Sequence, residues 1–288
     1  MLVVGATGNV GSLLIPLLLE AGVQVRALVR DQAKAESLRD QGVQVVFGDL
    51  DRPQTLDAAV DGADKVYVIT WNGPTGATHG HNLITAAMRT GRPHVVKQGG
   101  YGSPRSRIIQ HHWQMEYELR TSGLPYTLVR PTFFMQNTMM AAQTVAADGV
   151  IYMPFKDGRV GMVDVRDIAE AAAAVLTSQG HEGQEYILTG PRSISFHDVA
   201  AALSAALYKP VQYVDVPLEA GKQAITALGM DEWTADGFVE LFADFSTNWG
   251  DRVSPAMEQL TGHPGRSIEE FARDFAAVFG RTPVAAGA

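Results

Sequence analysis

The sequence of 288 residues contains no cysteine. Disulfide bonds, thiolate metal sites and cysteine nucleophiles are therefore excluded. Long basic runs are also missing and the formal net charge is −8, so a surface for nucleic acid or for an anionic membrane is not expected. The longest early apolar run, residues 13–19, is interrupted by Pro16 and is too short to span a bilayer.

The composition is typical of a globular protein. Hydrophobic residues make up 46% of the chain, which is enough for one large domain or two unequal ones. Residues 1–4 are expected to form a strand, which leaves no room for the positively charged start of a signal peptide. We therefore expect a cytoplasmic location.

The first half of the chain alternates short apolar runs with helical patterns. The expected strands are residues 1–4, 23–29, 43–47, 65–69, 94–97 and 126–130. The expected helices are residues 10–20, 32–40, 55–60, 78–90 and 107–122, and five helices are expected to end at Gly22, Gly42, Gly62, Gly91 and Gly123. This alternation predicts right-handed βαβ units and a doubly wound, Rossmann-like parallel sheet.

The second half shows a different order of elements. We expect strands at residues 161–163, 184–188 and 211–216, and helices at 165–177, 196–207, 218–228, 235–246 and 268–279. Two of these helices begin with the spacing of a capping box, Ser195 with Asp198 and Ser267 with Glu270. We therefore expect a dinucleotide-binding domain in residues 1–150. Residues 151–288 are expected to form a smaller α/β subdomain, intertwined with the first, that carries the substrate side of a cleft.

The clearest motif is the glycine loop of residues 5–11, which follows the first strand and opens the first helix. Gly5 permits a tight turn, Gly8 lets the backbone approach a diphosphate, and Gly11 allows the helix to pack closely on the strand. A diphosphate would then lie on free amides at the helix N-terminus. The spacing G-x-x-G-x-x-G favours a reductase or epimerase variant of this motif. The other predicted cofactor-binding residues of the loop are Thr7, Asn9 and Val10.

The end of the second strand indicates which cofactor is bound. Arg30 stands near the position where an acidic residue would bind the ribose of NAD, and Lys34 follows one helical turn later. A guanidinium there suits the 2′-phosphate of NADPH. NADH stays possible, because Asp31 could bind a ribose hydroxyl instead. After the third strand, Asp49 could accept from the adenine while Leu50 packs on the ring; the alternative is that Asp49 is an ordinary turn residue.

These residues, together with six further motifs, resemble the NmrA-like branch of the atypical short-chain dehydrogenase/reductase superfamily. The motifs are Gly48-Asp49-Leu50, residues 112–116, 122–127, 130–137, 164–169 and 188–191. The resemblance covers nearly the whole chain. It implies an NAD(P)H-dependent reductase of quinones, azo dyes or isoflavone-like compounds, or a member that binds the cofactor as a redox sensor without turnover.

The resemblance also implies which residues border the nicotinamide, at the carboxyl ends of the strands. The further cofactor-binding candidates are Thr70, Trp71, Lys97, Pro131 and Phe133. The candidates for the substrate side are Tyr101, Trp113, Phe134, Met135 and Asn137, with Trp233, Phe238 and Phe242 from a C-terminal lid. Each aromatic residue, taken singly, is more often ordinary core than ligand wall.

No standard catalytic tyrosine–lysine pair is expected. The one pair with the usual spacing is Tyr152 and Lys156, but Pro154 lies between them and would disrupt a helix. Tyr101 and His112 are therefore the catalytic candidates. His112 occupies the position where isoflavone-type reductases carry a catalytic lysine, and Glu116 lies one turn later on the same face. We expect this carboxylate to raise the pKa of His112 toward neutral; the alternative is that His112 only binds substrate or cofactor.

Two hypotheses follow for the function. The first is an NADPH-dependent oxidoreductase that transfers hydride to a flat, conjugated acceptor such as a quinone or an aromatic carbonyl compound. The second is a non-catalytic NAD(P) sensor that binds a protein partner. A homodimer is possible. A metal site is not expected, because the pairs His79/His81 and His112/Glu116 lack a third ligand nearby.

Overall fold

The computed structural model describes residues 1–70 and 72–280, and a seven-stranded parallel sheet is its centre. The strands are β1 (Leu2–Val4), β2 (Arg26–Val29), β3 (Gln44–Phe47), β4 (Lys65–Ile69), β5 (His94–Gln98), β6 (Tyr126–Pro131) and β8 (Glu185–Leu188). Their order is β3-β2-β1-β4-β5-β6-β8. The predicted doubly wound, Rossmann-like fold is confirmed, and the order reverses between β1 and β4, where such sheets open a crevice for ligands.

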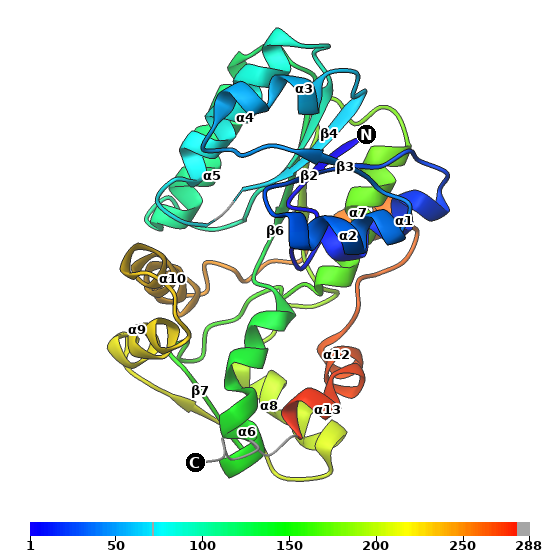
Figure 1. The fold of residues 1–288 in the computed structure, drawn as a ribbon. Helices are drawn as coiled ribbons and strands as arrows, with labels where there is room; N and C mark the ends of the chain where they lie inside the picture. The colour runs from blue at the N-terminus through cyan, green and yellow to red at the C-terminus, as the bar shows by residue number, and fades with distance from the viewer. Residues whose placement is uncertain (71, 281–288) are drawn as a thin grey trace.

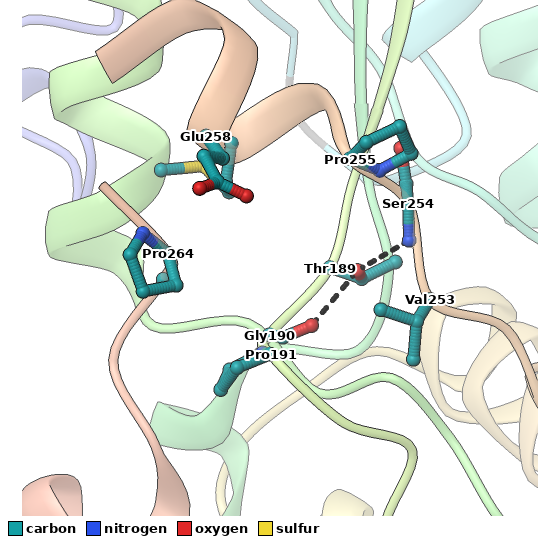
Figure 2. Close-up of a pocket in the computed structure, with 10 residues that line it drawn as sticks. Thr189, Gly190, Pro191, Val253, Ser254, Pro255, Glu258 and Pro264 are labelled. Carbon is teal, nitrogen blue, oxygen red and sulfur yellow. Dashed lines mark hydrogen bonds between the residues drawn. The ribbon is translucent and has the colours of Figure 1, made fainter. Parts of the chain in front are cut away.

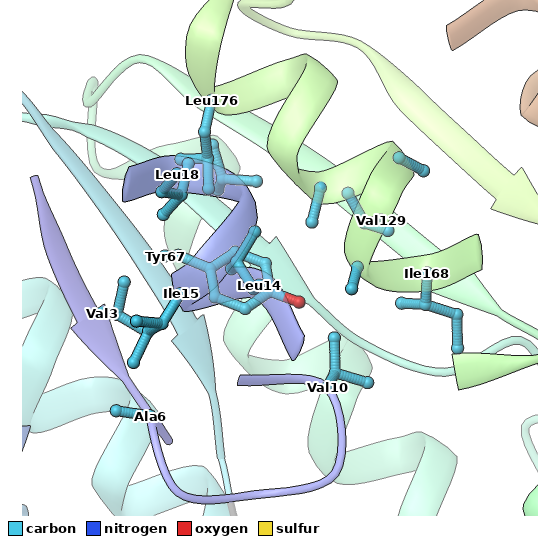
Figure 3. Packing of buried hydrophobic residues seen from close by; sticks show 14 of the residues in the cluster. Val3, Ala6, Val10, Leu14, Ile15, Leu18, Tyr67, Val129, Ile168 and Leu176 are labelled. Atoms are coloured by element: carbon cyan, nitrogen blue, oxygen red, sulfur yellow. The ribbon is translucent and has the colours of Figure 1, made fainter. Parts of the chain in front are cut away.

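Helices cover both faces of this sheet (Figure 1). One face carries α1 (Gly11–Glu20), α2 (Gln32–Asp40) and α7 (Val165–Thr177); the other carries α3 (Asp57–Val60), α4 (Gly76–Arg89) and α5 (Arg107–Thr121). Because successive strand residues point to opposite faces, neighbouring residues enter different cores. Val3, Tyr67 and Val129 pack with Leu14 and Ile168 on the α1 face, as Figure 3 shows.

The remaining elements form a second layer of structure around an aromatic core. A short parallel pair, β7 (Val150–Met153) and β9 (Gln212–Asp215), is surrounded by helices. These are α6 (Ala142–Asp148), α8 (Phe196–Leu207), α9 (Leu218–Ala227), α10 (Glu232–Phe245), α12 (Ile268–Asp274) and α13 (Ala276–Phe279). Five phenylalanine rings meet here, with Phe133 facing Phe155, Phe196, Phe242 and Phe245 at centroid distances of 5.3–6.4 Å.

The second half of the chain also contributes to the large sheet. Strand β8 pairs with β6, helix α7 packs against α1, and α11 (Ala256–Thr261) packs against α7. Residues 164–188 therefore complete the sheet and its cover before the chain returns to the smaller part. The division at residue 150 stays a prediction. No helix in residues 1–70 and 72–280 combines the length and apolar character needed to cross a membrane.

Several predicted element boundaries are wrong. Residues 161–163 form no strand, because Val160 and Val163 make only isolated bridges to Ile194 and Phe134. The predicted helix 268–279 is divided at Phe275. In place of the predicted helix 55–60 the chain forms a 3₁₀ turn, Pro53–Thr55, followed by the short α3. Helix α10 begins three residues earlier than expected because Asp231 caps it by accepting from the Thr234 amide.

The predicted helix caps are largely confirmed. Both capping boxes form, with Ser195 accepting from the Asp198 amide and Ser267 from the Glu270 amide. Four of the five predicted glycines have positive φ; at the fifth position, Gly91, the following residue Arg92 takes this conformation instead, with φ 52°.

The close approach of α1 to the glycine loop generates the first testable prediction. A Cβ at residue 11 would lie 2.9 Å from the carbonyl carbon of Gly5 and closer still to its oxygen. We therefore expect Gly11→Ala to destabilise the fold by about 1–3 kcal/mol, as overpacking does, and to weaken NADPH binding. Denaturant unfolding and calorimetric titration measure the two effects.

Gly91→Ala is the matched control for this variant. A Cβ at residue 91 meets no atom within 4 Å, so its effect is expected to stay within about 0.5 kcal/mol. Equal stability of the two variants would contradict the packing role of Gly11.

Candidate functional site

The glycine loop offers open backbone amides at the carboxyl end of β1. Gly5 has a φ of +87°, and its carbonyl accepts from the Gly8 amide at 3.0 Å, which closes the turn. Thr7, Gly8 and Asn9 are exposed. No acceptor within the described part of the chain pairs with the amides of Thr7 and Asn9. The loop and the start of α1 therefore fit a diphosphate, which would accept from these amides.

Val10 differs from its neighbours in the loop. Its side chain is 2% exposed and packs with Leu14 in the core beneath α1, as Figure 3 shows. Val10 was predicted to bind the cofactor, and only its backbone amide is in a position to do so. The apolar side chain instead anchors the loop to the core.

The candidates for the adenosine end of the cofactor lie on β2, β3 and the loops after them. Arg30 directly follows β2 and is exposed, and Lys34 is exposed in the first turn of α2. Both cations are therefore accessible to a 2′-phosphate. Asp31 caps α2, because its Oδ1 accepts from the Ala33 amide at 2.9 Å. This use of one oxygen leaves Asp31 less suited to bind a ribose hydroxyl.

Asp49 has the geometry of an ordinary turn residue, which is the alternative that the sequence left open. Its Oδ1 accepts from the Asp51 amide at 3.1 Å, which is an Asx turn. Leu50 is half-buried against the core of the α4 face, and its carbonyl accepts from Asn82. Thr70 is buried at the end of β4, and the predicted cofactor residue Trp71 lies outside the described residues.

A buried group of charged side chains lies between β5 and α5. Lys97, from β5, is fully buried; its Nζ donates to the Gln98 carbonyl and lies 2.9 Å from Nδ1 of His112, from α5. Burial lowers the pKa of Lys97 to about 7, although the nearby carboxylate of Glu116 acts in the opposite direction. Burial, followed by the charge of Lys97, lowers the pKa of His112 well below its usual value.

The expected support of His112 by Glu116 is wrong. Glu116 is directed to Arg130 of β6, whose Nε lies 3.1 Å from both carboxylate oxygens, and Arg130 also pairs with Glu185 of β8 at 2.7 Å. The carboxylate is therefore neutralised by a guanidinium, and a lysine takes its place beside the imidazole. Burial and that lysine lower the pKa of His112, whereas the sequence predicted a raised pKa.

Tyr101 lies in a polar aromatic group at the carboxyl end of β5. Its ring stacks on Trp249 at 5.1 Å, and its hydroxyl accepts from Arg252 at 3.0 Å. Trp249 and Arg252 come from the segment between α10 and α11 and were not predicted from the sequence. No local pattern pointed to them, because they lie about 150 residues from Tyr101 in the chain.

The candidate residues in the segment 131–137 differ in how deeply they are buried. Pro131 is buried as the last residue of β6. The side chains of Phe133 and Met135 are 3% and 1% exposed within the aromatic core, so the prediction that they contact cofactor or substrate does not fit. Phe134 and Asn137 are half-buried.

The other residues predicted to contact the substrate lie in different environments. Trp113 is 41% exposed on the outer side of α5, away from the inward face that carries His112. Phe242 is buried in the aromatic core, Phe238 is half-buried beside it, and Trp233 stacks on His111 at 4.6 Å. Helix α10 nevertheless covers the start of α5, because Glu240 accepts from the Arg107 amide and side chain.

Tyr152 and Lys156 do not form a catalytic pair. Tyr152 is exposed on strand β7, and Lys156 follows that strand with a φ of 48°. No group of three or more potential ligands in the described ranges is arranged to hold a metal ion.

Two cavities lie away from these residues. One, of about 350 Å³, follows β8 at the far edge of the sheet and is lined by Thr189, Pro191, Ser254 and Glu258 among others (Figure 2). The other, of about 570 Å³, lies between the β7–β9 pair and helices α9 and α10. Neither is lined by a residue that the sequence predicts to bind cofactor or substrate.

The fold and the open glycine loop together define a dinucleotide-binding protein of the doubly wound α/β class. The chain belongs to the NmrA-like family, whose sequence profile matches residues 1–271. The resemblance inferred from the motifs is therefore confirmed.

Three relatives illustrate the family. The NAD(P)H azoreductase of Xenophilus azovorans is 44% identical over 97% of this chain and 99% of its own. The structure of the Citrobacter sp. triphenylmethane reductase complexed with NADP(H) has a TM-score of 0.85 and 29% identity, and covers 96% of this chain and 99% of its own. The structure of an Escherichia coli NADPH-dependent quinone oxidoreductase with NADPH has a TM-score of 0.87 and 27% identity, covering 95% and 99%.

The second testable prediction concerns the pair of Glu116 and Arg130. Glu116→Gln removes one of the two carboxylates that pair with the half-buried Arg130 and leaves Glu185 as its remaining partner, so we expect a loss of about 1–3 kcal/mol in the free energy of unfolding. Glu118→Gln on the same helix is the control, because Glu118 pairs with the exposed His81 and such pairs contribute about 0–1 kcal/mol. Chemical denaturation measures both; a control that loses as much as Glu116→Gln would contradict the assignment.

Proposed function

We propose that this chain is an NADPH-dependent reductase that transfers hydride to quinone-type and azo-type acceptors. The observation that carries the proposal is its 44% identity, over 97% of the chain, with an NAD(P)H azoreductase. The exposed glycine loop supports it, because the loop presents free amides where a dinucleotide diphosphate binds. The accessible Arg30 and Lys34 favour NADPH over NADH.

The chemistry requires a hydride and a proton. When bound, the cofactor supplies the hydride, and the acceptor oxygen or nitrogen takes up one proton as the reduction completes. The protein orients the acceptor and supplies the proton. His112 is the proposed donor, because its imidazole lies against Gly100 in the loop after β5, directly before Tyr101.

The group of Tyr101, Trp249 and Arg252 is the proposed acceptor platform. The rings of Tyr101 and Trp249 are tilted by 40° at 5.1 Å, and Arg252 lies 5.5 Å from the centroid of the tyrosine ring. Such a surface of aromatic rings and a guanidinium suits a flat, conjugated molecule, which binds by stacking. A cationic triphenylmethane dye, the type of compound named for the Citrobacter relative, is a third acceptor to examine.

Three earlier expectations stay predictions beside this proposal. A homodimer and a cytoplasmic location are two of them. The third is the sensor alternative, in which the chain binds NADPH without turnover.

The third testable prediction concerns the activity itself. We expect NADPH oxidation, followed by its absorbance, to be accelerated with simple para-quinones and with azo dyes. NADPH binding by calorimetry accompanies the assay. Tight binding without turnover of any acceptor would overturn the reductase proposal and favour the sensor.

The fourth testable prediction concerns the choice of cofactor. Arg30→Ala removes a charge-assisted contact to the 2′-phosphate, which contributes about 1.5–3 kcal/mol, so NADPH affinity is expected to fall about 10- to 100-fold. NADH affinity is expected to stay unchanged. Arg39→Ala is the control, because Arg39 is a second arginine of this region that lies in the last turn of α2, over Phe47. Calorimetry decides; an equal loss for both cofactors would argue against the 2′-phosphate contact.

A further inference from the structure

The contact between Lys97 and His112 determines which ring nitrogen can hold the imidazole proton. Nζ of Lys97 lies 2.9 Å from Nδ1 of His112, and both side chains are buried. An ammonium group has only donors. While Lys97 is protonated, Nδ1 must therefore accept, and the single proton of the neutral ring is left on Nε2.

The opposite edge of the ring is directed at the loop after β5. A Cβ built on Gly100 would lie 3.3 Å from Cδ2 and 3.6 Å from Nε2 of His112. A Cβ on Gly99 would lie 2.9 Å from Glu116 and 3.4 Å from Nζ of Lys97. The two glycines thus allow the loop to pass directly over the Lys97–His112 pair. Nε2 therefore lies beside Gly100, the residue directly before Tyr101 in this loop.

We propose that Lys97 is a positioning residue that holds the proton of His112 on Nε2 and replaces it during reduction. The second part rests on the proposed function, whereas the first concerns the protein alone. In the reduction step the Nε2–H bond of His112 breaks and an O–H or N–H bond forms on the acceptor, whose two electrons arrive with the hydride from NADPH. One proton moves from the ammonium of Lys97 to Nδ1. A solvent proton then enters at Nε2, and the Nδ1 proton returns to Lys97.

The electrostatic surroundings make this exchange possible near neutral pH. The pKa of Lys97 is lowered to about 7 by burial, with Glu116 raising it and Arg130 lowering it further. The charged groups that face His112 are Lys97 and the neighbouring His111, both of which lower its pKa. The lysine is therefore charged below about pH 7 and increasingly neutral above it. A neutral amine can accept from Nδ1–H, so the proton is fixed on Nε2 only on the acidic side.

The first test measures the tautomer of His112 directly by ¹⁵N NMR of the full-length protein. At pH 6 we expect a neutral ring with its proton on Nε2, and above pH 8 a shift toward the Nδ1–H form. In Lys97→Met, which removes the donor, the preference for Nε2–H at pH 6 is expected to be lost. A wild-type ring protonated on Nδ1 at pH 6, or an imidazolium, would overturn the proposal whatever the activity of the protein.

The second test compares acceptors that differ in their need for a proton. Hydride transfer to a quinone also consumes a proton, whereas hydride transfer to a cationic triphenylmethane dye yields the neutral product directly. In single turnovers with NADPH, Lys97→Met is expected to slow the quinone reaction about tenfold, and His112→Asn about 100-fold, within the range for a positioned acid. The rate with the dye is expected to change less than twofold in both variants.

Lys65→Met is the matched control, because Lys65 is a second lysine of the sheet and its Nζ donates to two backbone carbonyls, those of Val175 and Ser178. It is expected to leave both rates and the tautomer unchanged. The wild-type quinone rate is expected to decline above about pH 7, and Lys97→Met to flatten this profile. Equal losses with quinone and dye, or an unchanged quinone rate, would overturn the relay. A wild-type chain that reduces neither acceptor would count against the proposed function alone, while the NMR result still decides the role of Lys97.

Discussion

The close contact between the first helix and the first strand is the constraint on which the rest of the molecule depends. Gly11 lies against the carbonyl of Gly5 at a separation that no side chain permits. This approach brings the start of α1 over the end of β1 and turns its free amides outward. It also presses Val10, Leu14 and Leu18 into the core that α1 shares with α7. Binding site and core packing thus use the same contact.

The second notable property is the charge buried under the carboxyl end of the sheet. Lys97, His112 and Glu116 come from β5 and α5 and are buried in space that a core of this kind usually fills with apolar groups, and the half-buried Arg130 of β6 lies beside them. Glu116 pairs with Arg130, and among the described residues no carboxylate forms an ion pair with Lys97. Desolvation then lowers the lysine pKa to about 7. A structural ion pair beside an unbalanced lysine is an arrangement typical of sites that move protons.

The smaller part of the chain supports the cleft more through packing than through specific chemistry. Four phenylalanine rings, those of Phe155, Phe196, Phe242 and Phe245, pack against Phe133, and Met135 lies in the same buried cluster. The backbone between them and the sheet is thereby fixed in place. Helix α10 joins α5 through Arg107 and Glu240, and the segment after α10 brings Trp249 and Arg252 to Tyr101. The wall of the crevice is therefore assembled from segments far apart in the chain.

Local patterns in the sequence were sufficient to predict the doubly wound parallel sheet, the glycine loop, the capping boxes and the family. Each of these depends on residues close together in the chain or on regular spacing. They also placed Arg30 at the end of the second strand and Lys34 one helical turn later, and the structure leaves both exposed. The partners of His112 and Glu116 were decided only in three dimensions. Helical spacing puts these two residues on one face, but two strands beneath that face supply other partners: β5 supplies a lysine to His112 and β6 an arginine to Glu116. The partner of a buried charge depends on which groups the tertiary structure brings close and on the cost of removing each from water. Neither can be deduced from residues that are neighbours in the sequence.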